Sequence, residues 1–296
     1  MTMKRKPTIS GVIFDTFNTL FMICIFVIVV YPFLYMINYS ISTPGQGRGT
    51  LMLLPSGLNL DSYKALLGDS AIIRALLISV SRSVLGPIGM IAVSGMAGYV
   101  LSKKDLIFGK FFRMFIFFTM YFSAGIIPTY LLIQSLGLTG SYWVYIIPLL
   151  VSPFNIVLIK TFVESIPESL EEAVLIDGGT DFDIYFRVIF HVCLPVNAAV
   201  LLFSAITHWN AFIDTQLYNY ANPELYTMQY VLFNTLGSKI VQSLERAKQA
   251  GMVQQRINAQ SMKMAISVIT IVPVMFVYPF LQRFFVSGIM VGSIKA

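Results

Sequence analysis

The segment ESIPESLEEAVLIDGGTDFDIYFRVIFHVCLP runs from Glu164 to Pro195 and lies between two long apolar stretches. It contains seven of the fourteen acidic residues, in a chain of which only 11% is charged. The seven are Glu164, Glu168, Glu171, Glu172, Asp177, Asp181 and Asp183. Charged groups are costly at membrane depth, so this concentration of acid indicates a polar loop exposed between two membrane spans.

The first part of this segment predicts a short helix. Pro167 suits a first helical position, and Gly178-Gly179 suits a helix end. At a helical step the acidic residues share one face and the apolar residues share the opposite face. The acidic face holds Glu168, Glu171 and Glu172, and the apolar face holds Leu170, Ala173 and Val174.

The second part predicts another helix after the glycines. It starts at Thr180, with Asp183 in the position of a capping-box acid. Its apolar face is formed by Phe182, Tyr185, Phe186, Ile189 and Phe190. The whole segment is therefore expected to fold as a helix, a glycine break and a second helix.

The composition indicates an integral membrane protein. The chain has 296 residues, is 56% hydrophobic and has a mean hydropathy of +0.76. A soluble domain of this length is usually less apolar, and about a quarter of its residues are charged. The net charge of +6 is explained by positively charged cytoplasmic segments. No basic–aromatic motif for nucleic acid accompanies it, and Cys24 and Cys193 suggest neither a disulfide nor a metal site.

The apolar stretches predict an all-α fold with six transmembrane helices, in one permease-sized domain that covers residues 1–296. The expected spans are about 17–37, 71–101, 112–136, 142–162, 196–219 and 262–283. The basic N-terminus followed by an apolar run could be a signal peptide, but no small-residue cleavage site follows, so an uncleaved first span is expected.

The polar segments between the spans predict the topology. Basic residues after the second span, among them Lys103 and Lys104, mark a short cytoplasmic loop. Both termini and the acidic loop 164–195 then lie in the cytoplasm, and residues 220–260 form an outer segment.

The acidic loop resembles the EAA loop of permease subunits in ABC importers. The matching residues are Glu172, Ala173 and Val174, then Asp177-Gly178, and finally Leu194-Pro195. Val174 stands where that motif has a second alanine, and His191 stands where the carbohydrate-uptake branch usually has proline. The resemblance extends to SAGIIPTYLLIQSLGL (123–138), HWNAF (208–212) and YPFLQRFFVSGIMVGSIKA (278–296). These segments are similar to permeases of type I importers for oligosaccharides and polysaccharide fragments.

The resemblance implies a coupling role for the loop and a set of partners. Its first helix would sit in a cleft of an ATPase subunit, with Glu168, Glu171, Glu172, Ala173, Asp177 and Gly178 as the coupling residues. The complex would hold a second permease, two ATPases that bind ATP and magnesium, and an external solute-binding protein. The oligosaccharide would cross a bacterial cytoplasmic membrane, and this chain would bind lipid but no cofactor.

The chain itself shows no enzyme signature. It has no Walker sequence, no nucleophile elbow and no cluster with metal-ligand spacing. Its two histidines, His191 and His208, lack a catalytic partner pattern. ATP hydrolysis is therefore expected in separate subunits.

Polar residues at membrane depth are candidates to line a substrate path, because they usually face an interior. They are Arg82, Gln134, Asn155, Trp209, Asn210 and Asp214. Trp209 and Asn210 suit a sugar, since an aromatic ring covers C–H groups and an amide bonds hydroxyls. The alternative for each residue is hydrogen bonding and packing between helices.

Arg82 lies about a third of the way along the second span and allows two interpretations. It can form a structural ion pair with Asp214 or with the companion permease. It can instead face the path and bind a carboxylate of the cargo, which predicts a uronic-acid-containing oligosaccharide.

Three other functions stay open from the sequence. The chain could serve an ABC importer of a non-sugar solute, because the EAA loop does not specify the cargo. It could be a secondary transporter with Asp214 as the proton or ion carrier, which transport without nucleotide would favour. It could be a membrane scaffold, which would show no substrate-dependent ATPase stimulation.

Overall fold

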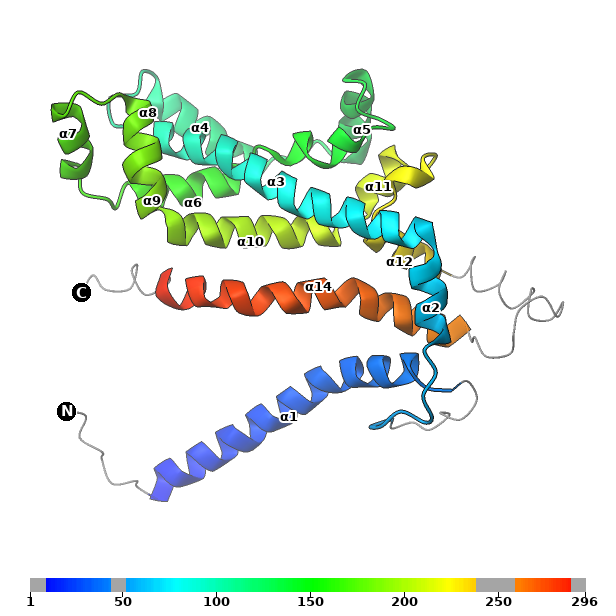
Figure 1. The fold of residues 1–296 in the computed structure, drawn as a ribbon. Helices are drawn as coiled ribbons and strands as arrows, with labels where there is room; N and C mark the ends of the chain where they lie inside the picture. Colours follow the sequence, from blue (N-terminus) through cyan, green and yellow to red (C-terminus); the bar gives the residue numbers. More distant parts are fainter. Residues whose placement is uncertain (1–8, 44–51, 238–258, 289–296) are drawn as a thin grey trace. The chain divides into compact units, whose positions relative to one another are not determined.

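The structure is a computed structural model, and it describes residues 9–43, 52–237 and 259–288. All regular elements in these ranges are helices (Figure 1). In chain order they are α1 (Ile9–Ser40), α2 (Asp61–Gly68), α3 (Ser70–Ser102), α4 (Gly109–Thr119), α5 (Ile126–Ser135), η1 (Tyr142–Tyr145), η2 (Ile147–Leu149), α6 (Pro153–Val163), α7 (Ser169–Ile176), α8 (Asp181–Asp183), η3 (Ile184–Ile189), α9 (Phe190–Val192), α10 (Leu194–Asn210), α11 (Ile213–Tyr218), η4 (Pro223–Leu225), α12 (Met228–Leu236) and α14 (Ala259–Gly288).

The chain divides into two compact units. The first is Met1–Gly68 with Ser238–Ile269, and the second is Asp69–Gly237 with Thr270–Ala296. In the first unit, α1 is followed by a polar connection that folds back on the end of that helix. Asn38 Nδ2 donates to the carbonyl of Leu53 at 2.8 Å, and Ser40 Oγ lies 2.7 Å from Tyr63 Oη.

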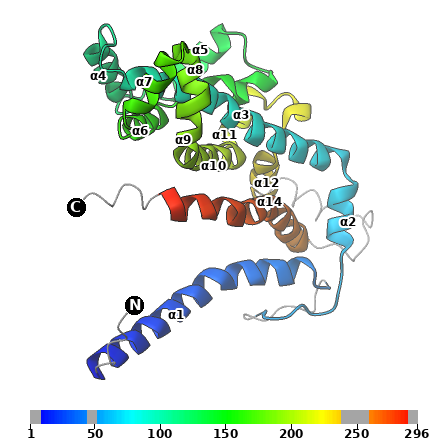
Figure 2. The same cartoon turned by 60° about the vertical axis from the view of Figure 1, so that its left-hand side comes forward.

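Helix α3 organises the second unit. Its 33 residues span about 50 Å, and its first turn is capped by Asp69, which accepts from the backbone N–H of Ala71 at 2.8 Å. It packs against α6, α10 and α12, as Figures 1 and 2 show for the first two. A Cβ on Gly98 would lie 3.1 Å from the Ile156 carbonyl, so the absence of a side chain there lets α3 and α6 approach closely.

Three helices are long and apolar enough to cross a membrane. They are Ile9–Ser40, Ser70–Ser102 and Ala259–Val277. They coincide with the first, second and sixth predicted spans. Two bent pairs raise the number to five: Tyr142–Leu149 with Pro153–Val163, bent by 44°, and Asp181–Val192 with Leu194–Asn210, bent by 78°. Within the described residues the structure therefore supports an all-helical membrane protein with three to five candidate spans.

The third and fifth predicted spans differ from the structure. The third, 112–136, is divided into α4 and α5, because the chain leaves the helix after Thr119 and Gly125 takes φ +85°. The fifth, 196–219, ends as a continuous helix at Asn210, where Ala211 becomes extended. The prediction for the outer segment 220–260 is described only in part, since residues 238–258 lie outside the described ranges.

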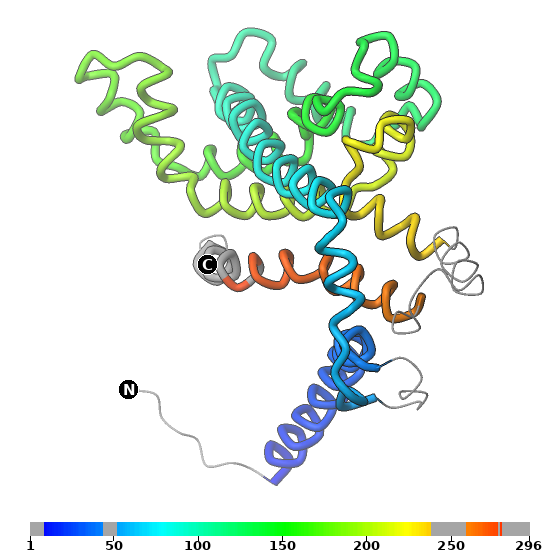
Figure 3. Tube along the Cα trace, turned by 45° about the vertical axis from the view of Figure 1, so that its right-hand side comes forward, coloured from blue at the N-terminus to red at the C-terminus, as the bar shows by residue number. Residues whose placement is uncertain are grey.

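The path of the chain separates two regions along α3. In Figure 3 the yellow-green trace leaves α6, passes through α7 and returns through α8 and α9 to α10. This loop lies at the C-terminal end of α3, whereas α11 and α12 lie toward its N-terminal end (Figure 1). One helix therefore contacts both regions.

Candidate functional site

The acidic loop has the helix–glycine–helix arrangement that the sequence predicts. Helix α7 ends at Ile176, Asp177 follows as its cap, and Gly178 takes φ +78°. This left-handed backbone strains other L-residues but is open to glycine, so Gly178 permits the turn. The helix begins at Ser169, so the prediction of a start at Pro167 is wrong by two residues.

The second helix of the loop begins with the predicted capping box. The backbone N–H of Thr180 donates to Asp183 Oδ2 at 3.0 Å, and Thr180 Oγ1 accepts from the N–H of Asp183 at 3.4 Å. Helical backbone then continues through His191 to Val192. Proline at position 191 would lack the N–H that this helix uses.

The buried face of this second helix differs from the predicted face. Residues Ile184–Ile189 form a π-helical turn, whose wider spacing moves side chains away from the positions that a 3.6-residue period gives. Phe182 and Phe186, both predicted to face inward, are 70% and 53% exposed. The buried side chains are Ile184, Tyr185, Ile189 and Cys193.

Two acids of α7 bind lysines of the same chain. Glu171 forms an ion pair with Lys103, and Glu168 forms one with Lys104 at 2.6 Å. The Lys103 ammonium also lies over the ring of Tyr99, 4.5 Å from its centroid. The acidic face that the sequence assigns to a partner subunit is thus partly occupied by the residues that follow α3.

These pairs shift the pKa values of their groups. Burial alone lowers the pKa of Lys103, but hydrogen bonding and charge from Glu171, with a contribution from Tyr99, leave that pKa raised. The hydrogen bond and charge of Lys104 lower the pKa of Glu168. Hydrogen bonds from the backbone and side chain of Thr180 lower the pKa of Asp183.

The remaining surface of α7 is exposed and mostly apolar. Ile176 is 86% exposed and Leu175 is 55% exposed. Glu172 and Asp177 flank them and form no ion pair within the described residues. The remaining exposed residues of this surface are Leu170 and Ala173. We call these six residues the outer surface of α7. Val174 alone packs against the core of this chain.

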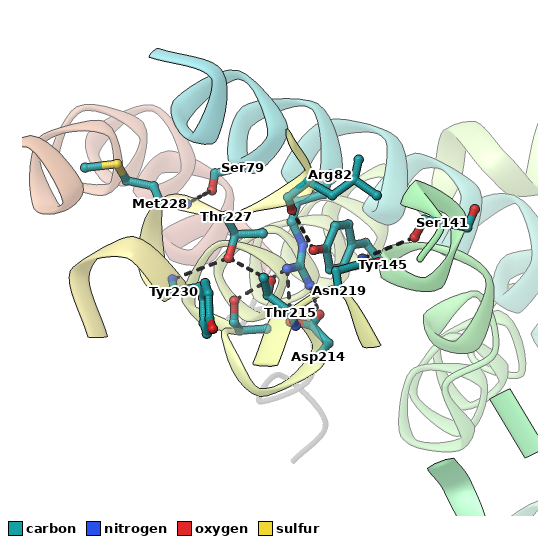
Figure 4. Close-up of polar contacts among 12 residues, drawn as sticks. Ser79, Arg82, Ser141, Tyr145, Asp214, Thr215, Asn219, Thr227, Met228 and Tyr230 are labelled. Carbon is teal, nitrogen blue, oxygen red and sulfur yellow. Dashed lines mark hydrogen bonds and ion pairs between the residues drawn. The ribbon is translucent and has the colours of Figure 1, made fainter. Parts of the chain in front are cut away.

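A second polar site surrounds Arg82 (Figure 4). Its side chain is 0% exposed and forms an ion pair with Asp214, which is 18% exposed. Its Nη1 also lies 3.3 Å from Asp214 Oδ1 and 3.4 Å from the Ala211 carbonyl, and its Cζ lies 4.4 Å from the centroid of the Tyr145 ring. The guanidinium thereby bonds a carbonyl that the end of α10 leaves free, which is the physical reason that the helix can break there.

Neutral hydrogen bonds extend the Arg82 site toward α12. Thr215 Oγ1 lies 3.0 Å from Thr227 Oγ1, and Ser79 Oγ accepts from the backbone N–H of Met228 at 2.7 Å. Tyr145 Oη donates to the Leu225 carbonyl at 2.7 Å. Figure 4 shows these side chains converging from separate helices, so the site connects α3, η1, α11 and α12.

The other path candidates do not gather around one point. Asn155 Nδ2 lies 3.4 Å from Met90 Sδ, and the indole N–H of Trp209 donates to the Thr270 carbonyl at 3.1 Å. Trp209 is buried, whereas Asn210 is exposed. The structure joins Arg82 with Asp214, the ion pair that one interpretation of the sequence predicts. The roles of all five residues in a path stay predictions.

Sequence reasoning missed the contacts of Lys103, Lys104 and Tyr145. The two lysines were assigned only to membrane topology, although twin lysines opposite an acidic helix also predict ion pairs. Tyr145 carried no polar motif, and its ring reaches Arg82 only because η1 and α3 meet in the fold.

No protein-family model matches the chain. It is 34% identical over 288 residues to the polygalacturonan/rhamnogalacturonan transport system permease protein YtcP of Bacillus subtilis (strain 168), with 96% of this chain and 98% of the relative covered. The chain belongs to the permeases of carbohydrate ABC transporters. These relatives are transport permeases, not enzymes.

Two further comparisons cover the permease from end to end. Protein LplC of Bacillus subtilis (strain 168) is 32% identical over 289 residues, covering 97% of each chain. A crystallised bacterial ABC transporter involved in the import of the acidic polysaccharide alginate contains a chain with a TM-score of 0.87 and 28% identity. That match covers 95% of the permease and 100% of the other chain.

Proposed function

We propose that this permease is the transmembrane subunit of an ATP-driven importer that moves an acidic oligosaccharide into the cytoplasm by alternating access. The outer surface of α7 carries the proposal. Its exposed Leu175 and Ile176, flanked by the unpaired acids Glu172 and Asp177, suit docking into a partner that offers an apolar cleft with basic or amide groups.

The proposed assembly follows from that docking. Two ATPase subunits bind ATP and magnesium, and their closure moves α7 together with the helices attached to it. A second permease and an external solute-binding protein complete the complex. In this arrangement the chain crosses a bacterial cytoplasmic membrane six times, with α4 and α5 sharing the third crossing. The termini and the loop 164–195 face the cytoplasm, and this chain binds no cofactor of its own.

The acidity of the cargo is supported by the names of the similar proteins. One names polygalacturonan, a polymer of a uronic acid, and another names the acidic polysaccharide alginate. Arg82 adds no support in this conformation, because its guanidinium is buried and bonded to Asp214. Asn210, which is exposed at the end of α10, is the more accessible group for a sugar hydroxyl.

The same ion pair weighs against a secondary transporter. A proton carrier must exchange its proton with water, but the Asp214 carboxylate is held by Arg82 and by the backbone N–H of Thr215 at 2.8 Å. An arginine at this distance keeps a carboxylate charged. An importer of non-sugar solutes is the remaining alternative, and it depends on cargo tests.

The test is uptake into vesicles that contain the permease, its companion permease and the ATPases, with the binding protein added outside. Galacturonate oligomers are compared with neutral galactose oligomers of equal length, with ATP or a non-hydrolysable analogue inside. We expect uptake of the acidic oligomer only with ATP. Uptake driven by an ion gradient without ATP would refute the importer mechanism, and equal or exclusive uptake of the neutral oligomer would refute the cargo.

The coupling surface is tested by Glu172→Lys, which reverses an exposed charge of α7. Asp105→Lys is the matched control, because it makes the same change at an exposed acid in the loop after α3. We expect Glu172→Lys to weaken ATPase binding and to lower uptake about tenfold, since like charges then face one another. Equal uptake by the two variants would remove this surface from the proposal.

A further inference from the structure

Helix α7 is attached to the rest of the permease in two different ways. On one side Val174 packs against the core formed with η3 and α10. On the other side Lys103, directly after the last residue of α3, forms an ion pair with Glu171. The first contact follows the chain forward into α10, and the second reaches a helix that lies earlier in the sequence.

The Lys103 pair is sheltered and built into the structure. The side chains of Lys103 and Glu171 are 25% and 21% exposed. The ring under the ammonium, Tyr99, is 4% exposed and lies 5.5 Å from the ring of Tyr185. Arg113 Nη1 donates to the carbonyls of Leu101 and Lys103, at 3.1 Å and 3.3 Å, and so fixes the backbone that carries the lysine.

The neighbouring pair lacks these features. Lys104 and Glu168 are 87% and 70% exposed, with a distance of 2.6 Å between Nζ and Oε1. An exposed pair of long side chains contributes little to stability. The chain therefore provides two consecutive lysines on the same loop helix, one sheltered and one open to solvent.

The two routes from α7 into the membrane-embedded helices differ in stiffness. Toward α10, the chain passes the turn at Gly178, the π-helical turn and a bend of 78°. Toward α3, the ion pair leads into one uninterrupted helix that runs about 30 Å from Lys103 to the buried Arg82 site. A continuous helix transmits a displacement along its axis with less loss than a jointed path.

We propose that the Lys103–Glu171 ion pair is a second mechanical link, through which motion of α7 reaches α3 and the Arg82 site. Lys103 is then a positioning residue for energy coupling. This inference rests on the proposed docking of α7 to an ATPase, and it adds a route and a residue that the loop motif does not contain.

The experiment uses the complete importer in vesicles and compares Lys103→Gln with Lys104→Gln as the matched control. The quantity measured is cargo imported per ATP hydrolysed, and assembly is checked by size-exclusion chromatography. We expect Lys103→Gln to assemble and to lower this ratio about five- to tenfold, and Lys104→Gln to leave it unchanged. The charge swap Lys103→Glu with Glu171→Lys should restore the ratio to within about threefold.

Three results would overturn the link: an unchanged ratio in Lys103→Gln, an equal loss in Lys104→Gln, or a charge swap that assembles without restoring the ratio. If Lys103→Gln does not assemble, the swap decides alone. Hydrogen exchange of α7 in the purified permease gives a readout without transport, and faster exchange is expected in Lys103→Gln only. ATP-independent uptake by the unmodified complex would refute the proposed function instead, and that outcome is separate from the variants.

Discussion

The two ends of α3 form ion pairs in different surroundings. Toward its N-terminal end the Arg82 side chain is 0% exposed and bonded to Asp214, whereas beyond its C-terminal end Lys104 and Glu168 are 87% and 70% exposed. Removing one member of a buried pair leaves an uncompensated charge, but an exposed pair contributes little. The comparison teaches that charge around Arg82 maintains the fold, while charge around α7 can be rearranged at low energetic cost during a transport cycle.

The largest predicted effect comes from breaking the buried pair. Arg82→Met should lower the free energy of unfolding by about 3 kcal/mol, because it leaves the Asp214 carboxylate without its partner. The measurement is unfolding of the purified permease in detergent. The double variant Arg82→Met with Asp214→Leu should recover at least half of the loss, because neither charge then remains.

Arg74 provides the control for that prediction. It lies on the same helix and forms a 2.9 Å pair with Glu224, but the two side chains are 46% and 76% exposed. Arg74→Met should change the unfolding free energy by less than about 1 kcal/mol. If the two arginine variants are equally stable, burial does not separate these pairs and the comparison fails.

The second prediction tests how tightly the Arg82 end is packed. A Cβ on Gly86, one turn beyond Arg82, would overlap the ring of His208 on α10. Gly86→Val should therefore destabilise the permease by about 2 kcal/mol through overpacking. His208→Ala in the same chain should relieve part of this loss. Gly68→Ala, at a position with nothing within 4 Å of the added carbon, is the control and should be tolerated.

Much of the fold follows from patterns that are local in sequence. The apolar stretches predict α1, α3 and α14, and the glycines and Thr180 predict the break between the loop helices. The division of the third span was missed, although Gly125 with φ +85° gave a local signal for it. The π-helical turn at Ile184–Ile189 carries no comparable signal, because its spacing depends on how Tyr185 packs against Tyr99 and Gly95.

The candidate sites were predictable to different degrees. Arg82 and Asp214 were paired from the cost of charge in a membrane, which leaves few partners within one chain. The pairing of α7 with Lys103 and Lys104 was missed, since it requires the C-terminal end of α3 to meet a loop 64 to 68 residues later. Such long-range contacts depend on helix packing and not on residue periodicity.

The third prediction concerns the turn between the loop helices. Gly178 takes φ +78° and has nothing within 4 Å of an added Cβ, so a substitution there creates backbone strain without a clash. Gly178→Val should cost about 1 kcal/mol in the loop and reduce cargo imported per ATP, while the whole permease stays folded. Gly178→Asn should cost less, because asparagine enters this conformation more readily. Equal transport by both variants and the unmodified chain would show that the turn is not needed for coupling.

The smallest predicted effect is an acid-dependent loosening of the second loop helix. Hydrogen bonds from the backbone and side chain of Thr180 lower the pKa of Asp183 in the folded state below its ordinary value of 3.8. A carboxyl group whose pKa is lowered by folding stabilises the fold above its unfolded pKa, and that stabilisation is lost as the pH falls through the folded pKa. Hydrogen exchange of the first turn after Thr180 should therefore accelerate below about pH 4, while exchange in α3 around Arg82 stays slow. Asp183→Asn should remove this acid-dependent step and leave the first turn equally protected at both pH values. Acceleration of the same size in the asparagine variant would assign the acid sensitivity to other carboxyl groups of the loop. Simultaneous loss of protection around Arg82 would show that the two ends of α3 unfold as one unit.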